Sequence, residues 1–288
     1  MARLLITGAN GQLGNCFKWV APQFPEHHFY YASQQEVDIT QPDTLHVFYE
    51  KNPFDILLNC AAYSNVDLAE KESNKARKIN ADGVESIALF AEQIPIGVVH
   101  FSTDYVFDGM NTEGYSENDL PQPINVYGES KMLGEQVLRQ SKCKATTIRI
   151  SWLFSPFGKN FVKTILQQGK EKKILKVVDD QIGKPTSGSA LANWVLNAIQ
   201  RPDFFSHPTY HFAQGPSCSW YTFAQKIIAF AHLPCELHPC KSEEYPTVAK
   251  RPKHSVLLTQ RTENKIPLPI PSWETDLETC VQILQTDA

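Results

Sequence analysis

A glycine-rich turn near the start of the chain constrains the fold most. Gly8, Gly11 and Gly14 follow the short apolar run 3–7, and residues 12–20 can form a helix. Glycine permits a tight turn and lets backbone N–H groups approach a phosphate, while a helix N-terminus favours negative charge. A strand, a glycine turn and a helix in this order predict the first unit of a dinucleotide-binding sheet. The alternative interpretation is three glycines that serve only the turn.

Further strands alternate with helices through the first half of the chain. We expect strands at 28–32, 55–60, 97–102 and 146–151, and helices at 42–51, 66–93 and 125–140. Thr40 is the expected N-cap of the helix at 42–51, with Pro42 in its first turn. Because alternating strands and helices form parallel sheets, the predicted fold class is α/β, a Rossmann-type doubly wound parallel sheet.

The second half of the chain has a different character. Proline becomes frequent after residue 151, and helices are expected at 159–169, 187–201 and 219–232. The predicted organisation is a dinucleotide-binding domain over 1–150 and a smaller C-terminal substrate-binding lobe over 151–288. Within that lobe, the region of about 187–213 is a candidate to return to the first domain.

Composition excludes several classes of function. The net charge of −4 gives no general attraction to nucleic acid or to anionic membranes. Apolar runs are shorter than the ~18 residues that span a bilayer, and the first residues indicate a strand rather than a signal peptide. Seven irregularly spaced cysteines without a CxxC pair predict reduced thiols in a cytoplasmic protein. The spacing of Cys235, His238 and Cys240 fits no common zinc pattern, so no metal is expected.

Tyr127 and Lys131 are the first candidate catalytic pair. Their spacing of four residues puts both side chains on one face of the helix expected at 125–140. An ammonium beside a phenol stabilises the phenolate, and such a tyrosine can exchange a proton with a carbonyl oxygen. The hydride would then come from a nicotinamide bound at the glycine turn. The alternative is a solvated tyrosine and lysine on a helix surface.

Two hydroxyl or aromatic side chains near strand ends are candidates for the substrate side. Thr103 supplies a hydroxyl that can bond a substrate oxygen, or it can simply cap a helix. Trp152 can lie against a sugar ring or belong to the core. The basic cluster at 250–253 can meet a diphosphate or be solvated surface.

Small residues after the strand at 55–60 are expected to let a cofactor lie close. They include Ala61 and Ala62, and the alternative is a tight strand exit. Asp38 can accept from an adenine amine and also belong to a capping turn. The strand at 28–32 ends without an acid, and no Lys or Arg stands between residues 18 and 51. Because an acid there would repel a 2′-phosphate, the expected cofactor is NADPH, with NADH tolerated.

Motifs along nearly the whole chain resemble one family. They are GANGQLG at 8–14, VDIT at 37–40, NCAAYSNVDLAE at 59–70, FSTDYVFDG at 101–109, NVYGESKMLGE at 125–135, RISWLF at 149–154, DDQIGKPT at 179–186 and YPTVAKRPKHSVL at 245–257. In this order they resemble the dTDP-4-dehydrorhamnose reductase family of the extended short-chain dehydrogenases/reductases. The later motifs are more specific than the glycine turn because they fall in the substrate lobe.

The resemblance implies NAD(P)H-dependent reduction of the 4-keto group of a dTDP-linked 6-deoxy-hexulose to dTDP-L-rhamnose. It implies that Tyr127 donates the proton, that Lys131 binds the nicotinamide ribose and tunes Tyr127, and that Thr103 tunes the transfer. With Asp104, Thr103 would meet the substrate, and Trp152 would line the sugar pocket. Residues expected at the cofactor are Gly11, Gln12 and Leu13 at the pyrophosphate, and Asp38, Ile39, Ala62, Tyr63, Ser64 and Phe101 along the cleft.

Two departures from the family pattern bear on cofactor and assembly. Family members often carry an acid where this chain has Ala32, which leaves the choice between NADPH and NADH open. Some members have a C-terminal glutamate in a magnesium-bridged dimer, and the stretch at 280–284 lacks an acid. We therefore expect no such metal and leave a homodimer as an option.

Three other functions remain as alternatives. One is a non-catalytic, NADP-binding regulatory subunit of the methionine adenosyltransferase type, which shares this architecture. The others are another nucleotide-sugar reductase and an epimerase. Dehydratases typically have Glu after the Thr-Asp pair, where this chain has Tyr105, so dehydration is disfavoured.

Overall fold

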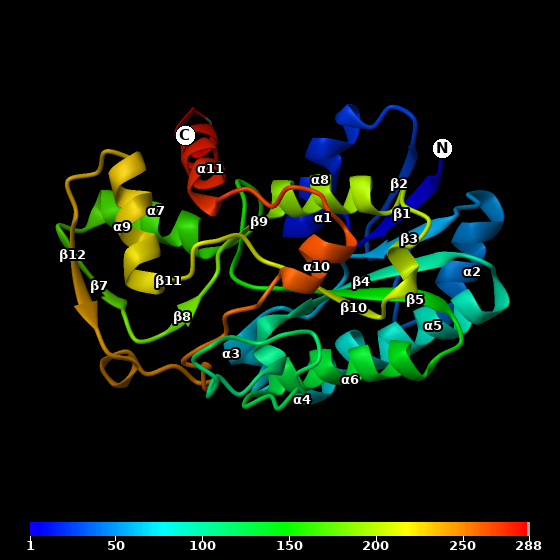
Figure 1. Cartoon of the computed structure of the whole chain (residues 1–288), viewed down its shortest axis with the longest axis horizontal. Coiled ribbons are helices and arrows are strands. Elements are labelled where there is room, and N and C mark those ends of the chain that lie inside the picture. The colour runs from blue at the N-terminus through cyan, green and yellow to red at the C-terminus, as the bar shows by residue number, and fades with distance from the viewer. Residues whose placement is uncertain (287–288) are drawn as a thin grey trace.

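Six parallel strands form the central sheet of the computed structural model, which describes residues 1–286. The order across the sheet is β10–β5–β4–β3–β1–β2 (Figure 1). The strands are β1 (Arg3–Thr7), β2 (His28–Ala32), β3 (Ile56–Asn59), β4 (Gly97–Thr103), β5 (Lys144–Ile150) and β10 (Thr209–Phe212). The order reverses between β1 and β3, which is where such sheets bind ligands. The predicted fold class is confirmed.

Helices cover both faces of the sheet because each strand alternates apolar side chains between the two faces. One face, with Leu4 and Ile6, packs against α1 (Gln12–Val20) and α8 (Gly188–Ala198). The other face, with Leu5, packs against three helices. These are α2 (Pro42–Lys51), α5 (Gly83–Gln93) and α6 (Val126–Gln140).

A smaller lobe lies beside the sheet, at the left of Figure 1. Its core joins Val162, Phe223 and Trp273 from three different helices. The helices are α7 (Phe161–Glu171), α9 (Trp220–Phe230) and α11 (Trp273–Thr286). The strands of this lobe are β7 (Ile174–Val178) with β12 (Glu236–Cys240), β8 (Ile182–Gly183) with β11 (Cys218–Ser219), and β6 (Leu153–Phe154) with β9 (Thr186–Ser187).

Two late segments lie with the large sheet rather than with the smaller lobe. Strand β10 pairs in parallel with β5, and α8 packs on α1 (Figure 1). Both fall within the region of about 187–213, which we expected as a candidate to return to the first domain. The division of the chain at residue 150 stays a prediction. The remaining elements are α10 (Gln260–Lys265) and the short helical turns Ala21–Gln23, Asp104–Val106, Phe204–Ser206 and Ser242–Glu244.

The segment expected as one helix at 66–93 is divided instead. It contains α3 (Val66–Ala69), α4 (Ser73–Arg77), the π-helical turn Lys78–Asp82 and α5. Within the π turn, Asn80 is buried, and its amide accepts from the Tyr63 backbone N–H and donates to the Tyr63 carbonyl, both at 2.9 Å. The wider turn thus ties the helix to the loop after β3, as π turns near functional sites often do.

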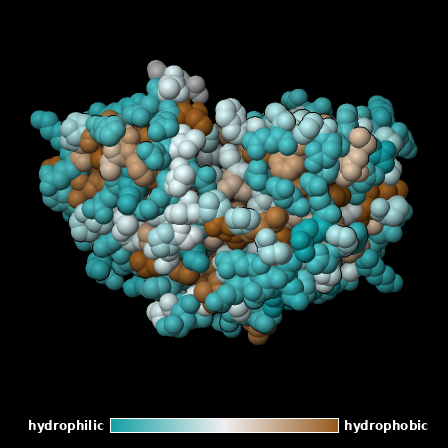
Figure 2. Space-filling view, turned by 45° about the horizontal axis from the view of Figure 1, so that its top comes forward, coloured by the Kyte–Doolittle hydropathy of each residue, from teal (hydrophilic) through white to brown (hydrophobic). Residues whose placement is uncertain are grey.

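The surface is mainly hydrophilic on the face drawn in Figure 2, with hydrophobic residues in separate patches. Among residues 1–286, no helix is both long and apolar enough to cross a membrane.

Candidate active site

Two adjoining cavities open at the carboxyl ends of β1, β3 and β4. The first, here the inner cavity, has a volume of about 310 Å³, and the second, the outer cavity, about 240 Å³. Gly11, Cys60 and Ala62 line both, so the two form one continuous cleft. Predicted site residues in the inner cavity are Gly11, Gln12, Leu13, Ala62, Ser64, Phe101, Thr103, Asp104, Tyr127, Lys131 and Trp152. Those in the outer cavity are Gly8, Gly11, Asp38, Ile39, Ala61 and Ala62.

The glycine turn is built for close approach of backbone to ligand. Gly8 has φ +61°, and a Cβ there would lie 2.7 Å from the Ala61 Cα. Gly14 lies under the turn, since a Cβ there would come within 2.6 Å of the Ala9 Cα. Gly11 precedes α1 and offers no side-chain cap, so the first N–H groups of the helix stay free for an anion. The turn therefore fits a dinucleotide pyrophosphate.

Asp38 belongs to a capping turn and also lines the cleft, where an adenine amine could meet it; both positions were expected from the sequence. Its Oδ1 accepts from the Thr40 backbone N–H at 3.0 Å and from the Thr40 hydroxyl at 2.8 Å, while the residue lines the outer cavity. The prediction that Thr40 caps α2 is wrong, because Gln41 is the N-cap residue and the Thr40 hydroxyl is engaged by Asp38. Asp38 thus fixes the turn that shapes the cleft.

Lys131 is buried at the floor of the inner cavity. Its Nζ donates to the Phe101 carbonyl at 2.6 Å and lies 3.3 Å from His100 Nε2. Burial lowers the pKa of Lys131 to about 8, against the opposing field of Glu135 one turn further along α6. The ammonium and the neutral amine are therefore close in free energy near neutral pH.

Tyr127 lies one turn before Lys131 on the same helix and faces the same cavity. Burial raises the pKa of Tyr127 to about 12, although the Thr103 hydroxyl lowers it in part. We expected the lysine to lower this pKa, and the expectation is wrong. The reason is that the Lys131 amine bonds to the Phe101 carbonyl on β4. Burial of the phenol therefore has the largest effect on the pKa of Tyr127. Tyr127 is thus held as a protonated acid.

Thr103 and Asp104 stand at the end of β4. The Thr103 hydroxyl accepts from the Tyr105 backbone N–H and donates to Asp104 Oδ1, both at 3.1 Å. Burial raises the pKa of Asp104 to about 7, and its Oδ2 is buried without a hydrogen-bond partner among the described residues. Thr103 therefore caps the helical turn, and both residues line the inner cavity.

Trp152 has a partner that the sequence did not reveal. Its ring stacks on Trp220 with centroids 3.5 Å apart and planes 7° apart, and both line the inner cavity. Trp152 has φ +48°, and its ring fits only because Gly183 has no side chain, since a Cβ there would lie 2.5 Å away. The only sequence signal for Trp220 was its place at the start of an expected helix.

Tyr63 and Gly14 are the predicted site residues that line neither the inner nor the outer cavity. The Tyr63 hydroxyl donates to Glu72 at 3.0 Å, and the Tyr63 ring packs with Ala69 and Ala76. The role of Tyr63 at the cofactor stays a prediction.

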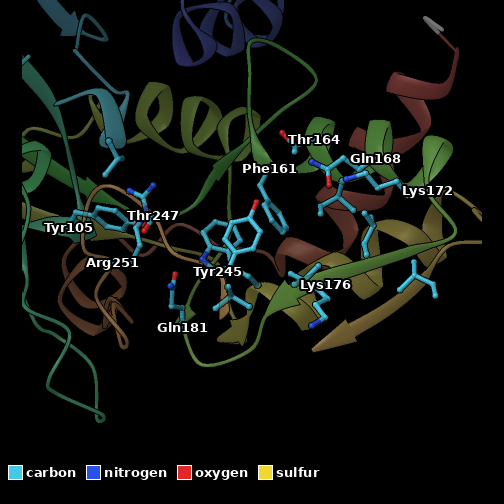
Figure 3. A pocket seen from close by; sticks show the side chains of 17 residues that line it. Tyr105, Phe161, Thr164, Gln168, Lys172, Lys176, Gln181, Tyr245, Thr247 and Arg251 are labelled. Atoms are coloured by element: carbon cyan, nitrogen blue, oxygen red, sulfur yellow. The ribbon is translucent and has the colours of Figure 1, made fainter. Parts of the chain in front are cut away.

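A third and larger cavity of about 650 Å³, the lobe cavity, adjoins the site on the side of the smaller lobe. Val66, Tyr105 and Trp220 line both it and the inner cavity. Figure 3 shows Arg251 beside Tyr105 at one end, and Lys172 at the other.

Arg251 is the member of the basic cluster 250–253 that enters this lobe cavity. Its Nη2 donates to Asp67 at 2.8 Å and its guanidinium lies 5.8 Å from the Tyr105 ring centroid. Its Nη1 is buried with no hydrogen-bond partner among residues 1–286. Lys250 and Lys253 are exposed. The described part of the chain has no cluster of three His, Cys, Asp or Glu side chains that could hold a metal.

Comparison with known proteins gives matches over nearly the full length. A family model described as RmlD substrate binding domain matches residues 2–286. The dTDP-4-dehydrorhamnose reductase of Aggregatibacter actinomycetemcomitans is 36% identical and covers 96% of this chain and 98% of its own. The enzyme of that name from Escherichia coli K12 is 33% identical over 98% of both chains.

Solved structures agree with these relatives. A dTDP-4-dehydrorhamnose reductase from Bacillus anthracis, in complex with NADP, has a TM-score of 0.91 at 38% identity, covering 98% of this chain and 99% of that one. One from Clostridium acetobutylicum has a TM-score of 0.93 at 36% identity with the same coverage. A UDP-glucose 4-epimerase of Thermus thermophilus, at 14% identity and a TM-score of 0.84, shares the fold.

Proposed function

The chain belongs to the RmlD substrate binding domain family, and on that premise we propose that it is an NADPH-dependent reductase of a dTDP-linked sugar. The reaction is reduction of the 4-keto group of dTDP-4-dehydro-L-rhamnose to dTDP-L-rhamnose, a step in the synthesis of nucleotide sugars for polysaccharides. Relatives of that name match over nearly the whole chain, and one solved relative holds NADP.

One observation carries the proposal. Tyr127, Lys131 and Thr103 face a single cavity that continues into the cleft under the glycine turn. A proton donor and a dinucleotide cleft that share one space are what carbonyl reduction requires.

Specific residues support a bound dinucleotide. The glycine turn at Gly8 and Gly11 would hold the pyrophosphate at the N-terminus of α1. Asp38 and Ile39 would lie at the adenine end of the cleft, and Lys131 at the nicotinamide ribose. Gln34 stands in the outer cavity where an acid would repel a 2′-phosphate, which favours NADPH, and NADH stays an option.

The chemistry that a bound reduced nicotinamide supplies is a hydride for the carbonyl carbon. Tyr127 gives its proton to the carbonyl oxygen, so a C=O double bond becomes an alcohol. Thr103 would orient that oxygen by a hydrogen bond once its hydroxyl proton turns from Asp104 Oδ1 to the carbonyl oxygen. Lys131 would hold the nicotinamide ribose from the same cavity, one turn further along α6. Tyr127 then regains a proton from solvent before the next turnover.

The lobe cavity is the proposed place for the nucleotide part of the substrate. It shares Val66, Tyr105 and Trp220 with the inner cavity, and its volume of about 650 Å³ exceeds the 310 Å³ of that cavity. Arg251 has an unpaired N–H group that a diphosphate oxygen could accept from, since guanidinium groups bind phosphates with charge-assisted bonds. Trp152, stacked on Trp220, would flank the sugar.

A substrate-panel assay tests this function. The protein is incubated with NADPH and with dTDP-, UDP- and GDP-linked 4-keto-6-deoxy sugars, and loss of NADPH absorbance is followed. We expect turnover of the dTDP-linked sugar. NADPH binding without oxidation would instead indicate the regulatory-subunit alternative, and turnover of another nucleotide sugar would correct the substrate.

Assembly and location stay predictions. We propose a cytoplasmic enzyme, for which the seven free cysteines are the supporting observation. A homodimer remains an option that light scattering of the purified protein would decide.

A further inference from the structure

A row of polar side chains crosses three neighbouring strands just behind the site. Thr7 of β1 pairs in register with Asn59 of β3, and Asn59 pairs with His100 of β4. All three are buried, with at most 1% of their surface exposed. The row before them, Leu5, Leu57 and Val98, is apolar and belongs to the core under α5 and α6. The polar row is therefore the last layer of that face before the cleft.

Hydrogen bonds link this row to the active-site lysine. Thr7 Oγ1 and Asn59 Oδ1 are 2.8 Å apart, and Asn59 Nδ2 and His100 Nδ1 are 3.1 Å apart. His100 Nε2 then lies 3.3 Å from Nζ of Lys131. This lysine belongs to α6, the helix that packs on the same face of the sheet. A buried polar chain of this kind is costly unless every member has a partner.

The surroundings of Lys131 leave one N–H group for the cleft. The Phe101 carbonyl accepts one N–H, and His100 faces a second. The titratable or charged groups facing it are the Cys60 thiol at the end of β3, His100 of β4, and Tyr127 and Glu135 on its own helix. Glu135 is itself neutralised by Arg149 of β5 at 2.7 Å.

Donor and acceptor chemistry fixes the tautomer of the histidine. Burial, with the nearby charge of Lys131, lowers the pKa of His100 well below its ordinary value, so the ring is neutral and has one donor and one acceptor nitrogen. Below the Lys131 pKa of about 8 the amine is an ammonium, which has donors only, so Nε2 must accept and Nδ1 must carry the proton. In the structure Asn59 Oδ1 accepts from Thr7 and Nδ2 faces His100 Nδ1, so this tautomer requires the Asn59 amide to be turned end for end, with its oxygen accepting from Nδ1–H and its NH₂ group donating to Thr7 Oγ1.

We propose that His100 is a positioning residue for catalysis, which holds the Lys131 ammonium through Nε2 while Asn59 fixes the Nδ1–H tautomer. The inference rests on the proposed function for what the amine does at the cofactor. The placement of the amine itself depends only on contacts within the protein.

The tautomer is measured directly by NMR of the unliganded protein with ¹⁵N-labelled histidine. The His100 ring is identified as the signal lost in His100→Gln. We expect a proton on Nδ1, a pyridine-type Nε2, and no protonation of the ring across the neutral pH range. A proton on Nε2, or an imidazolium at neutral pH, would overturn the proposal.

Two substitutions separate the two contacts of the ring. The amide of His100→Gln can reach the position of Nε2 and accept from Lys131, whereas the shorter amide of His100→Asn can meet only Asn59. We expect His100→Gln to have the same alkaline limb in the pH profile of kcat as the unaltered protein, and the same affinity for NADPH. His100→Asn should move that limb to lower pH by about one unit, because the ammonium loses one acceptor.

His238→Gln is the matched control, since this exposed histidine lies in the smaller lobe. It should leave NADPH affinity and the pH profile unchanged. If His100→Gln and His100→Asn both show the pH profile and the NADPH affinity of the unaltered protein, the positioning role is rejected. If the sugar substrate proves wrong, the NMR result and NADPH titrations by fluorescence still test His100, so the two proposals fail separately.

Discussion

Replacement of Lys131 by methionine should change how stability depends on pH. Burial places the pKa of this amine at about 8, against 10.5 for the free group. The difference of 2.5 units corresponds to a cost of about 3 kcal/mol for keeping the charge in the folded protein. That cost is fully present below pH 8, where both folded and unfolded chains hold the proton.

The sign follows from the lowered pKa. Above pH 8 the folded protein releases the proton while the unfolded chain keeps it up to about 10.5, so the unaltered protein gains stability as pH rises. Lys131→Met has no such group and does not gain. Between pH 7 and about pH 9.5, the free energy of unfolding of the unaltered protein should therefore rise by about 2 kcal/mol relative to the variant. Packing and hydrogen-bond losses are the same at both pH values and cancel.

Urea unfolding of both proteins at the two pH values measures this difference. Lys170→Met is the control, because that lysine is exposed on α7 and should show no differential pH dependence. A difference between Lys131→Met and the unaltered protein that stays the same at both pH values would refute the reasoning. The variant should also bind NADPH more weakly and lose activity.

Three further substitutions test other parts of the site and its support. Tyr127→Phe should lower kcat by about 10²–10⁴-fold while NADPH affinity, measured by fluorescence, stays within a few fold, since only the proton donor is lost. Gly8→Ala should abolish NADPH binding, because its Cβ would lie 2.7 Å from the Ala61 Cα at a positive φ; normal affinity would reject the close-approach argument. Arg149→Met leaves the buried Glu135 carboxylate unpaired and should cost about 3–5 kcal/mol in urea unfolding; a loss under about 1 kcal/mol would show that Glu135 finds another partner.

Local pattern was enough to predict the frame of the site. The glycine turn, the strand ends and the spacing of Tyr127 and Lys131 are set by residues within one or two turns of chain. Parallel strands bring their carboxyl ends together, so residues at 8, 61 and 103 could be expected to converge without any knowledge of packing.

Long-range packing supplied what the sequence could not. Trp220 stacks on Trp152 from 68 positions away, and nothing local distinguishes it from the other tryptophans. Arg251 lines the lobe cavity and donates to Asp67, which comes from the other half of the chain. The orientation of Tyr63 depends in the same way on Glu72 and on the π turn that follows.

The electrostatic prediction for Tyr127 was wrong for a general reason. A spacing rule places a cation near the phenol, but it contains no information on burial or on competing acceptors. Here the Phe101 carbonyl and His100 take the contacts of Lys131, and burial decides the pKa of the tyrosine. The polar row was visible in principle as polar residues at the ends of two strands, Thr7 and Asn59, and within a third, His100.

Direct transfer of a hydride to the sugar is the central claim, and isotope transfer tests it most directly. The protein is incubated with dTDP-4-dehydro-L-rhamnose and NADPH deuterated at the transferable position of the nicotinamide. We predict a dTDP-L-rhamnose product that is one mass unit heavier, with the deuterium at C4 of the sugar. Product without deuterium, or bound NADPH that is never consumed, would contradict the assignment.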